Sequence, residues 1–140
     1  MIRVTADTNI IISGMIFPHG KPFQLLELAR EGKINLSVSV AILDEMSEVL
    51  VRKFRFTDEE VAEARRRIRA IARTVTPAVL LNVVKEDADD NRILECAVSA
   101  GSDYIVSGDK DLLRLGRYDS IGIVSPSDLL DLLNERHRTQ

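Results

Sequence analysis

The chain has 140 residues, 45% of them hydrophobic and 29% charged, which suits one globular domain with an aliphatic core. The formal net charge of −3 gives no overall attraction to nucleic acid, so such a partner would need a local basic surface or metal ions. The only cysteine, Cys96, excludes an intramolecular disulfide. No segment is apolar and long enough to span a bilayer, and the N-terminus lacks a signal-peptide pattern, so we expect a cytoplasmic protein.

Short apolar strands alternate with amphipathic helical segments along the whole chain. In the first half we expect a strand over 2–6, a helix over 22–30, a strand over 36–38 and a helix that Ser39 caps and that runs to 53. A helix with a capping box at Thr57 and an end at Pro77 follows, and then a candidate strand over 78–84. In the second half we expect helices over 93–100, 110–115 and 126–134 and strands over 104–106 and 121–124. This alternation predicts an α/β domain with a mainly parallel sheet. We expect a single domain over 1–134 and a frayed tail over 135–140.

Two acids stand at the ends of expected strands. Asp7 directly follows the first strand, and Asp109 comes shortly after the strand Tyr104–Val106. Ligands of parallel α/β sheets bind beyond the carboxyl ends of the strands, so the two acids would share one site if their strands are neighbours. Each acid alone is equally well explained as the cap of the helix that follows it.

Two further groups of acids are less specific. Glu45 lies within a helix, and its spacing groups it with Glu48 on a polar face, where an ordinary solvated surface explains both. Asp87, Asp89 and Asp90 crowd together before a helix that needs only one capping acid. A nearby cation would make this surplus of negative charge tolerable, but the spacing does not choose among the three.

The types of residue present favour one class of chemistry. Carboxylate oxygens suit hard cations such as Mg²⁺ or Mn²⁺, which can hold a phosphodiester, activate water and stabilise the leaving oxygen. His19 lies in an expected loop and His137 in the expected tail, so a histidine acid–base pair is not indicated. Ser/His/Asp and Cys/His nucleophiles fail for the same reason, and Cys96 fits a small core residue.

Basic residues gather before and within the helix that begins at Thr57. The candidates for contact with a nucleic acid are Arg52, Lys53, Arg65, Arg66 and Arg69. They can form a strip that contacts phosphates, or an ordinary solvated face paired with nearby glutamates. The sequence pattern leaves both interpretations open.

Four acidic motifs in this order resemble the PIN-domain family. They are VTADTNIIIS with Asp7, ILDEMSEVL with Glu45, DADDNRILECA with Asp90, and DYIVSGDKDLL with Asp109. The likeness covers nearly the whole chain. It is strongest to prokaryotic PIN proteins described as toxin components of toxin–antitoxin systems, of the VapC type.

The resemblance implies a three-layer, Rossmann-like fold with about five mainly parallel strands and helices on both faces. It also implies an Mg²⁺- or Mn²⁺-dependent endoribonuclease whose catalytic and metal-binding residues are Asp7, Glu45, Asp90 and Asp109. The supporting residues that it implies are Thr8, Asn9, Asn91, Ser107 and Asp111. Implied partners are an RNA substrate, a cognate antitoxin protein and further copies of the chain in a dimer or tetramer.

Two other functions are weighed against the nuclease. A non-catalytic PIN-type module could hold RNA or a protein without turnover. A phosphotransfer protein could form an aspartyl phosphate at Asp7, but Asp7-Thr8-Asn9 lacks the second acid two residues on that the phosphatase pattern requires.

Overall fold

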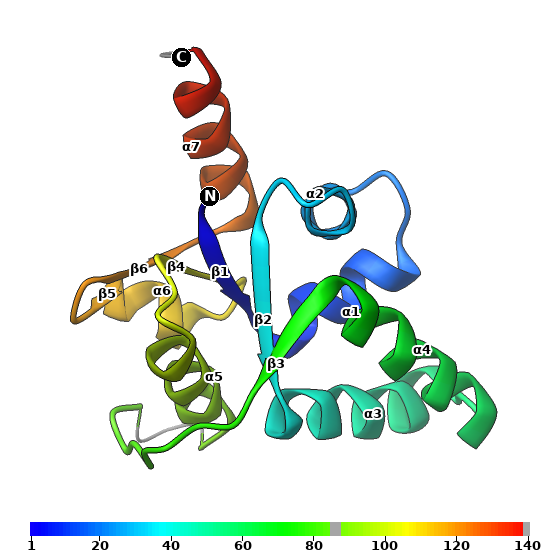
Figure 1. The fold of residues 1–140 in the computed structure, drawn as a ribbon. Coiled ribbons are helices and arrows are strands. Elements are labelled where there is room, and N and C mark those ends of the chain that lie inside the picture. Colours follow the sequence, from blue (N-terminus) through cyan, green and yellow to red (C-terminus); the bar gives the residue numbers. More distant parts are fainter. Residues whose placement is uncertain (85–87, 139–140) are drawn as a thin grey trace.

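The computed structural model describes residues 1–84 and 88–138, and Figure 1 shows their arrangement. The strands are β1 (Arg3–Ala6), β2 (Asn35–Ser39), β3 (Ala72–Val75), β4 (Tyr104–Val106), β5 (Arg117–Tyr118) and β6 (Ile121–Val124). The helices are α1 (Thr8–Ile16), α2 (Lys21–Arg30), α3 (Val40–Phe54), α4 (Asp58–Ile71), α5 (Ala88–Ala100), α6 (Lys110–Leu115) and α7 (Pro126–Arg138). Within the described residues, no helix is both long and apolar enough to cross a membrane.

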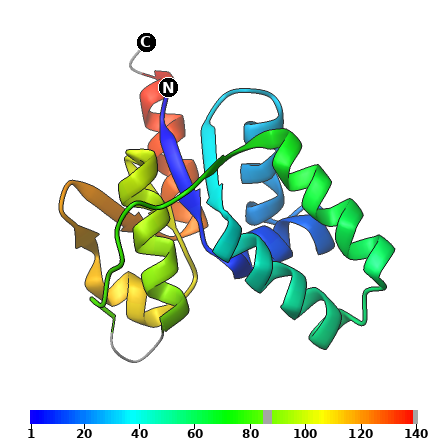
Figure 2. The same ribbon diagram turned by 60° about the horizontal axis from the view of Figure 1, so that its bottom comes forward.

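The strands form one sheet in the order β3-β2-β1-β4-β6-β5. All neighbours are parallel except the short β5, which pairs antiparallel with β6. The chain moves outward from β1 to β3 and then returns to place β4 on the other side of β1. Because such crossovers are right-handed, α1 to α4 lie on one face of the sheet and α5 on the other. The expected α/β fold with helices on both faces is confirmed (Figures 1 and 2).

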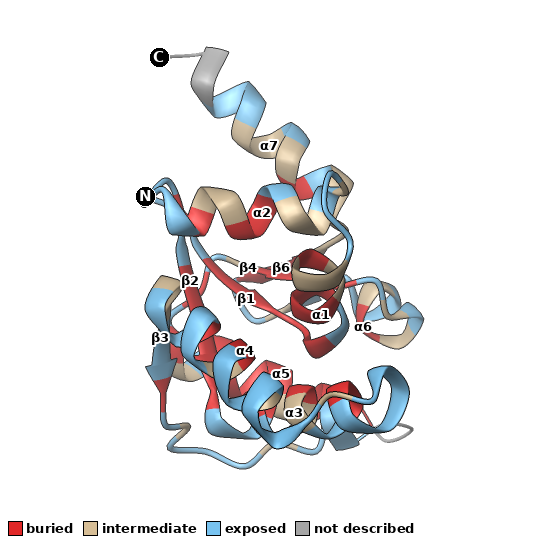
Figure 3. Ribbon diagram, turned by 90° about the vertical axis from the view of Figure 1, so that its right-hand side faces the viewer, coloured by how far each residue is buried: buried red, intermediate tan, exposed pale blue. Residues whose placement is uncertain are grey.

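The core is aliphatic, as the composition predicts. Its largest fully buried side chains include Ile11 of α1, Leu43 and Leu50 of α3, and Leu94 of α5. The outer sides of α3 and α4 remain exposed (Figure 3). Burying one such side chain stabilises the fold by about 1.5–3 kcal/mol, so apolar packing between the layers dominates over the short strand ladders.

Two of the helix caps that the sequence predicts are present in the structure. The Thr57 capping box is present: the Thr57 amide donates to Glu60 Oε1 at 2.9 Å, and the Glu60 amide donates to Thr57 Oγ1 at 3.2 Å. The Ser39 hydroxyl accepts from the Ile42 amide at 3.2 Å and so caps α3. Gly14 lets α1 and α2 pack closely, because a Cβ there would lie 2.5 Å from Leu26 Cδ1.

Other expectations were wrong. The helix from Thr57 ends at Ile71, well before Pro77, and the chain enters β3 at once. Residues 78–84 form no strand, because side chains of α5 occupy their backbone amides in place of a neighbouring strand.

The ends of two helices also differ from the expected ones. Helix α5 begins at Ala88, so the expected acidic turn is its first turn, and Asp87 lies outside the described residues. Helix α7 continues to Arg138 rather than ending at Asn134. The domain boundary at residue 134 stays a prediction.

Candidate metal centre

Asp7 and Asp109 lie on neighbouring strands at the point where the strand order reverses. Asp7 follows β1 and Asp109 follows β4, and these strands pair with Ala6 opposite Val106. In open α/β sheets this reversal is the usual place for a ligand. The two strands are therefore neighbours, as a shared site for Asp7 and Asp109 requires.

Both acids also cap helices, so the two interpretations of them are compatible. Asp7 Oδ1 accepts from the Ile10 amide at 2.9 Å at the start of α1. Asp109 Oδ1 accepts from the amides of Asp111 and Leu112 at 2.9 and 3.1 Å at the start of α6. Each cap uses one carboxylate oxygen, which leaves the other for a second contact.

The remaining acids converge on the same place. Ligand oxygens of Asp90, Asp109 and Asp111 lie within 4.8 Å of one another. A small hollow of about 40 Å³ is lined by Asp7, Thr8, Asn9, Glu45, Asp89, Asp90, Ile93 and Asp109. The four acids singled out by the family motifs thus line one hollow, and they come from the end of β1, from α3, from α5 and from the turn after β4. Their role as metal ligands stays a prediction.

The structure shows which of the neighbouring acids face the hollow, a choice that sequence spacing left open. Glu45 is half-buried and its Oε2 accepts from Thr8 Oγ1 at 2.9 Å. Glu48 points outward, with its side chain 72% exposed and Oε1 4.0 Å from Arg52 Nε. Asp89 and Asp90 both line the hollow, with Asp90 buried and Asp89 exposed. Asp89 is therefore a site residue that the family motifs alone passed over.

Ser107 links two of the acids. Its side chain is fully buried, and its hydroxyl donates to Asp7 Oδ2 while accepting from the Asp109 amide, the latter at 2.9 Å. Thr8 and Asn9 line the hollow, as expected for small polar residues beside a metal. Asn91 differs from them, since it does not line the hollow and contacts the backbone at Val83 and Val84.

Among the described residues that line this hollow, five are acidic and none is basic. Burial raises the pKa of Asp7; hydrogen bonds from Ser107 and the Ile10 amide lower it, and the nearby charge of Asp109 raises it further. A divalent cation would offset this crowding. The donor set fits such an ion, because all ligands are oxygens and the hollow has room for an ion with a water but not for a nucleotide.

Three residues of the expected basic strip form ion pairs with acidic side chains at the surface. Arg65 Nη1 lies 3.0 Å from Asp44 Oδ1 and donates to Ser47 Oγ at 2.9 Å. Arg66 pairs with Glu63 on α4, and Arg52 with Glu48 on α3. None of the five basic candidates lines the acidic hollow, so contact with RNA stays a prediction for all of them, including Lys53 and Arg69.

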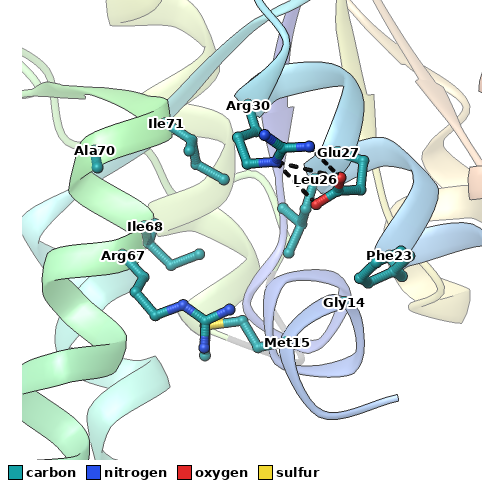
Figure 4. A pocket seen from close by; sticks show the side chains of 10 residues that line it. All are labelled: Gly14, Met15, Phe23, Leu26, Glu27, Arg30, Arg67, Ile68, Ala70 and Ile71. Atoms are coloured by element: carbon teal, nitrogen blue, oxygen red, sulfur yellow. Dashed lines mark hydrogen bonds and ion pairs between the residues drawn. The ribbon is translucent and has the colours of Figure 1, made fainter. Parts of the chain in front are cut away.

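A larger hollow of about 380 Å³ lies elsewhere, between α1, α2 and α4 (Figure 4). Leu26, Ile68 and Ile71 form its apolar wall, and the Glu27–Arg30 ion pair stands at its edge. It contains none of the strand-end acids. Size alone therefore does not identify the metal centre, and the chemistry of the lining does.

Sequence reasoning missed the ion pair on α5 between the half-buried Arg92 and the buried Glu95. Arg92 Nη2 lies 2.7 Å from Glu95 Oε2, and the Glu95 side chain is 4% exposed. A signal was available, because Glu95 stands between the apolar residues Leu94 and Cys96, one helical turn after Asn91.

Comparisons with known proteins identify the family and the fold. A family model described as PIN domain matches residues 3–111. The uncharacterized protein MJ1680 of Methanocaldococcus jannaschii is 31% identical over 118 residues, which cover 81% of this chain and 75% of that protein.

A solved structure has the same fold. A chain of the VapBC2 complex of Rickettsia felis, crystallised with a DNA fragment from its promoter, superposes with a TM-score of 0.64 at 12% identity. The match covers 87% of this chain and 97% of that one. Since the family model spans most of the strands and all the acidic motifs, the chain belongs to the PIN-domain family.

Proposed function

We propose that the chain is a divalent-metal-dependent endoribonuclease. The observation that carries this proposal is the convergence of Asp90, Asp109 and Asp111, whose ligand oxygens lie within 4.8 Å of one another. Asp7 and Glu45 line the adjoining hollow. An all-oxygen donor set of this density is typical of Mg²⁺ or Mn²⁺ sites.

The roles of the side chains follow from their places. Asp7, Asp90 and Asp109 would hold the ion, directly or through water, with Asp111 as an assistant. Glu45, oriented by the Thr8 hydroxyl, completes the shell or aligns the attacking water. Bound there, Mg²⁺ or Mn²⁺ would supply charge stabilisation for the phosphodiester and a more acidic water.

Ser107 and the two helix caps hold the acids in place before any ligand arrives. The Ser107 hydroxyl fixes Asp7 Oδ2, and the Ile10 amide fixes Asp7 Oδ1. The substrate would lie across the mouth of the hollow, and basic residues on α3 and α4 would contact its phosphates. Of these, Lys53 and Arg69 are proposed contacts, together with Arg52, Arg65 and Arg66 once they leave their surface partners.

The biological role that we propose is the toxin of a toxin–antitoxin pair. Support comes from the sequence resemblance to toxin components and from the shared fold with a chain of a VapBC complex. A cognate antitoxin would then be the protein partner, in the cytoplasm, and further copies of the chain would complete a dimer or tetramer. The apolar side of α7, where Leu130 and Leu133 remain half-buried, is one surface for such contacts.

An RNA cleavage assay with a matched pair of variants tests this function. Glu45→Gln removes the half-buried acid, and Glu48→Gln makes the same charge change one helical turn away on the exposed side. We expect the wild type and Glu48→Gln to cleave RNA only with Mn²⁺ or Mg²⁺, and Glu45→Gln to lose at least 100-fold in rate, on the scale of one transition-state contact.

Calorimetry and a second substrate distinguish the alternatives. Absence of Mn²⁺ binding at millimolar metal would favour a non-catalytic binding module over the nuclease. Equal cleavage of single-stranded DNA of the same sequence would leave the metal centre intact but contradict the assignment to RNA.

A further inference from the structure

The chain between β3 and α5 is attached to α5 by hydrogen bonds to side chains. Figures 1 and 2 show it running beside α5 before the helix begins. The Ala78 amide donates to Ser99 Oγ at 3.4 Å, and the Leu81 amide donates to Glu95 Oε2 at 2.8 Å. We call residues 78–84 the strap. Backbone amides need partners, and here one face of a helix supplies them instead of a strand.

Asn91 makes the densest of these attachments. Its Oδ1 accepts from the amides of Val83 and Val84 at 2.8 and 2.9 Å, and its Nδ2 donates to the Val84 carbonyl at 2.7 Å. The side chain is 3% exposed. Two donors on one side and a carbonyl on the other require an amide, because a carboxylate of the same shape could not donate to Val84.

A second attachment lies one helical turn further along α5. Glu95 Oε2 accepts from the Leu81 amide, and Arg92 Nη2 donates both to Glu95 Oε2 and to the Leu81 carbonyl, the latter at 3.3 Å. The ion pair compensates the charge of Glu95 in its buried place. The strap is thus fixed at Leu81 and again at Val83 and Val84 to the helix that carries two acids of the hollow.

We propose that Asn91 is a positioning residue for the metal centre. It is adjacent to Asp90, which lies in the first turn of α5 and in the acid cluster. Ligand oxygens of Asp90 and Asp109 lie within 4.8 Å of each other, so the like charges of the two carboxylates oppose this placement of the turn. Three hydrogen bonds between the buried Asn91 side chain and the strap hold the turn in place against that repulsion, so the carboxylates are arranged before an ion binds. This inference rests on the proposed function.

The test compares Asn91→Ala with two controls. Ser99→Ala removes the attachment at the far end of the same strap, and Ile68→Val loosens the core in α4, away from the acids. Mn²⁺ affinity is measured by calorimetry, and amide hydrogen exchange at Val83, Val84 and the first turn of α5 is measured without metal. Asn91→Ser, which keeps a small hydroxyl, provides a milder variant if the alanine variant is poorly folded.

We expect Asn91→Ala to weaken Mn²⁺ binding by 10- to 100-fold, as for other residues that orient metal ligands, and to lose exchange protection at Val83 and Val84. Asn91→Ser should fall between this variant and the wild type, while Ser99→Ala and Ile68→Val bind Mn²⁺ within twofold of the wild type. Lost protection at the strap with unchanged Mn²⁺ affinity would overturn the positioning role alone. A wild type that binds no Mn²⁺ would instead overturn the proposed function, and the positioning role with it.

Discussion

Replacing Asp7 with Asn should stabilise the metal-free protein. The side chain is 5% exposed, and burial raises the pKa of this carboxyl despite the hydrogen bonds from Ser107 and the Ile10 amide. A raised folded-state pKa means that ionisation at neutral pH weakens the fold, by about 1.4 kcal/mol for each pKa unit. Asn keeps the acceptor for the Ile10 amide but leaves the Ser107 hydroxyl without its acceptor, at a cost of about 0.5–1 kcal/mol.

The net expectation is that the variant has a higher free energy of unfolding and a higher Tm than the wild type at pH 7, because the buried charge is removed and only one hydrogen-bond acceptor is lost. The sign depends on pH. The favourable contribution of the neutral Asp7 carboxyl is fully present in the wild type below its unfolded pKa of 3.8 and is lost as the pH rises through the higher folded value. The advantage of the variant should therefore appear as the pH rises to neutral and vanish in acid.

Metal should reverse this order. At a Mn²⁺ concentration 100 times its Kd, the wild type gains about 2.7 kcal/mol from binding, whereas Asp7→Asn has lost a ligand and gains far less. Urea unfolding in EDTA and in Mn²⁺ measures both states, and Glu48→Gln controls for the same change of net charge. A variant less stable than the wild type in EDTA would refute the argument from burial. Equal Mn²⁺ stabilisation of both proteins would refute the ligand role of Asp7.

Three further outcomes are expected. Gly14→Ala should destabilise the protein by about 1–2 kcal/mol in urea unfolding, because the 2.5 Å approach to Leu26 outweighs the helix preference of Ala, about 1 kcal/mol; a stabilised variant would contradict this packing. Glu45→Gln should lower Mn²⁺ affinity at least tenfold in calorimetry while Glu48→Gln leaves it unchanged, and equal affinities would remove Glu45 from the site. Cys96, whose thiol pKa burial raises to about 11, should resist iodoacetamide at pH 8 until the protein is unfolded, and rapid labelling of the native protein would contradict its burial.

Local signals made much of the fold predictable. The strands at Tyr104–Val106 and Ile121–Val124 and the helix Lys110–Leu115 lie where the sequence places them. The Thr57 capping box acts as expected because all its atoms lie within one turn. Such features depend on neighbours in sequence, so sequence alone is sufficient to find them.

The failures occurred where partners outside a segment decide the structure of that segment. Residues 78–84, AVLLNVV, have the composition of a strand, whereas β3 at Ala72–Val75 contains Arg73 and Thr74. The sheet takes the less apolar segment because α5 side chains bind the amides of the other one. Asn91 and Glu95 lie only 7 to 14 residues from the amides that they bind, but no sequence pattern identifies them as partners of residues 78–84.

Some residues of the candidate site could likewise be found from local sequence, and others could not. The rule on strand ends finds Asp7 and Asp109 from local sequence, since both follow apolar strands. Glu45 needed the family motif, because helical spacing places it on a polar face with Glu48. Only the fold brings Glu45 to the Thr8 hydroxyl and leaves Glu48 at the surface.

The caps at Asp7 and Asp109 decide which substitutions can test the metal centre. Each acid uses Oδ1 to start a helix, and Asp7 uses Oδ2 for the Ser107 hydroxyl beside the other acids. Alanine at either position would remove a cap, at a cost of about 1 kcal/mol, together with the candidate ligand. Its effect on activity would mix helix fraying with loss of metal. Asparagine keeps the cap and removes the charge, so only the Asp→Asn variants measure what the second oxygen contributes.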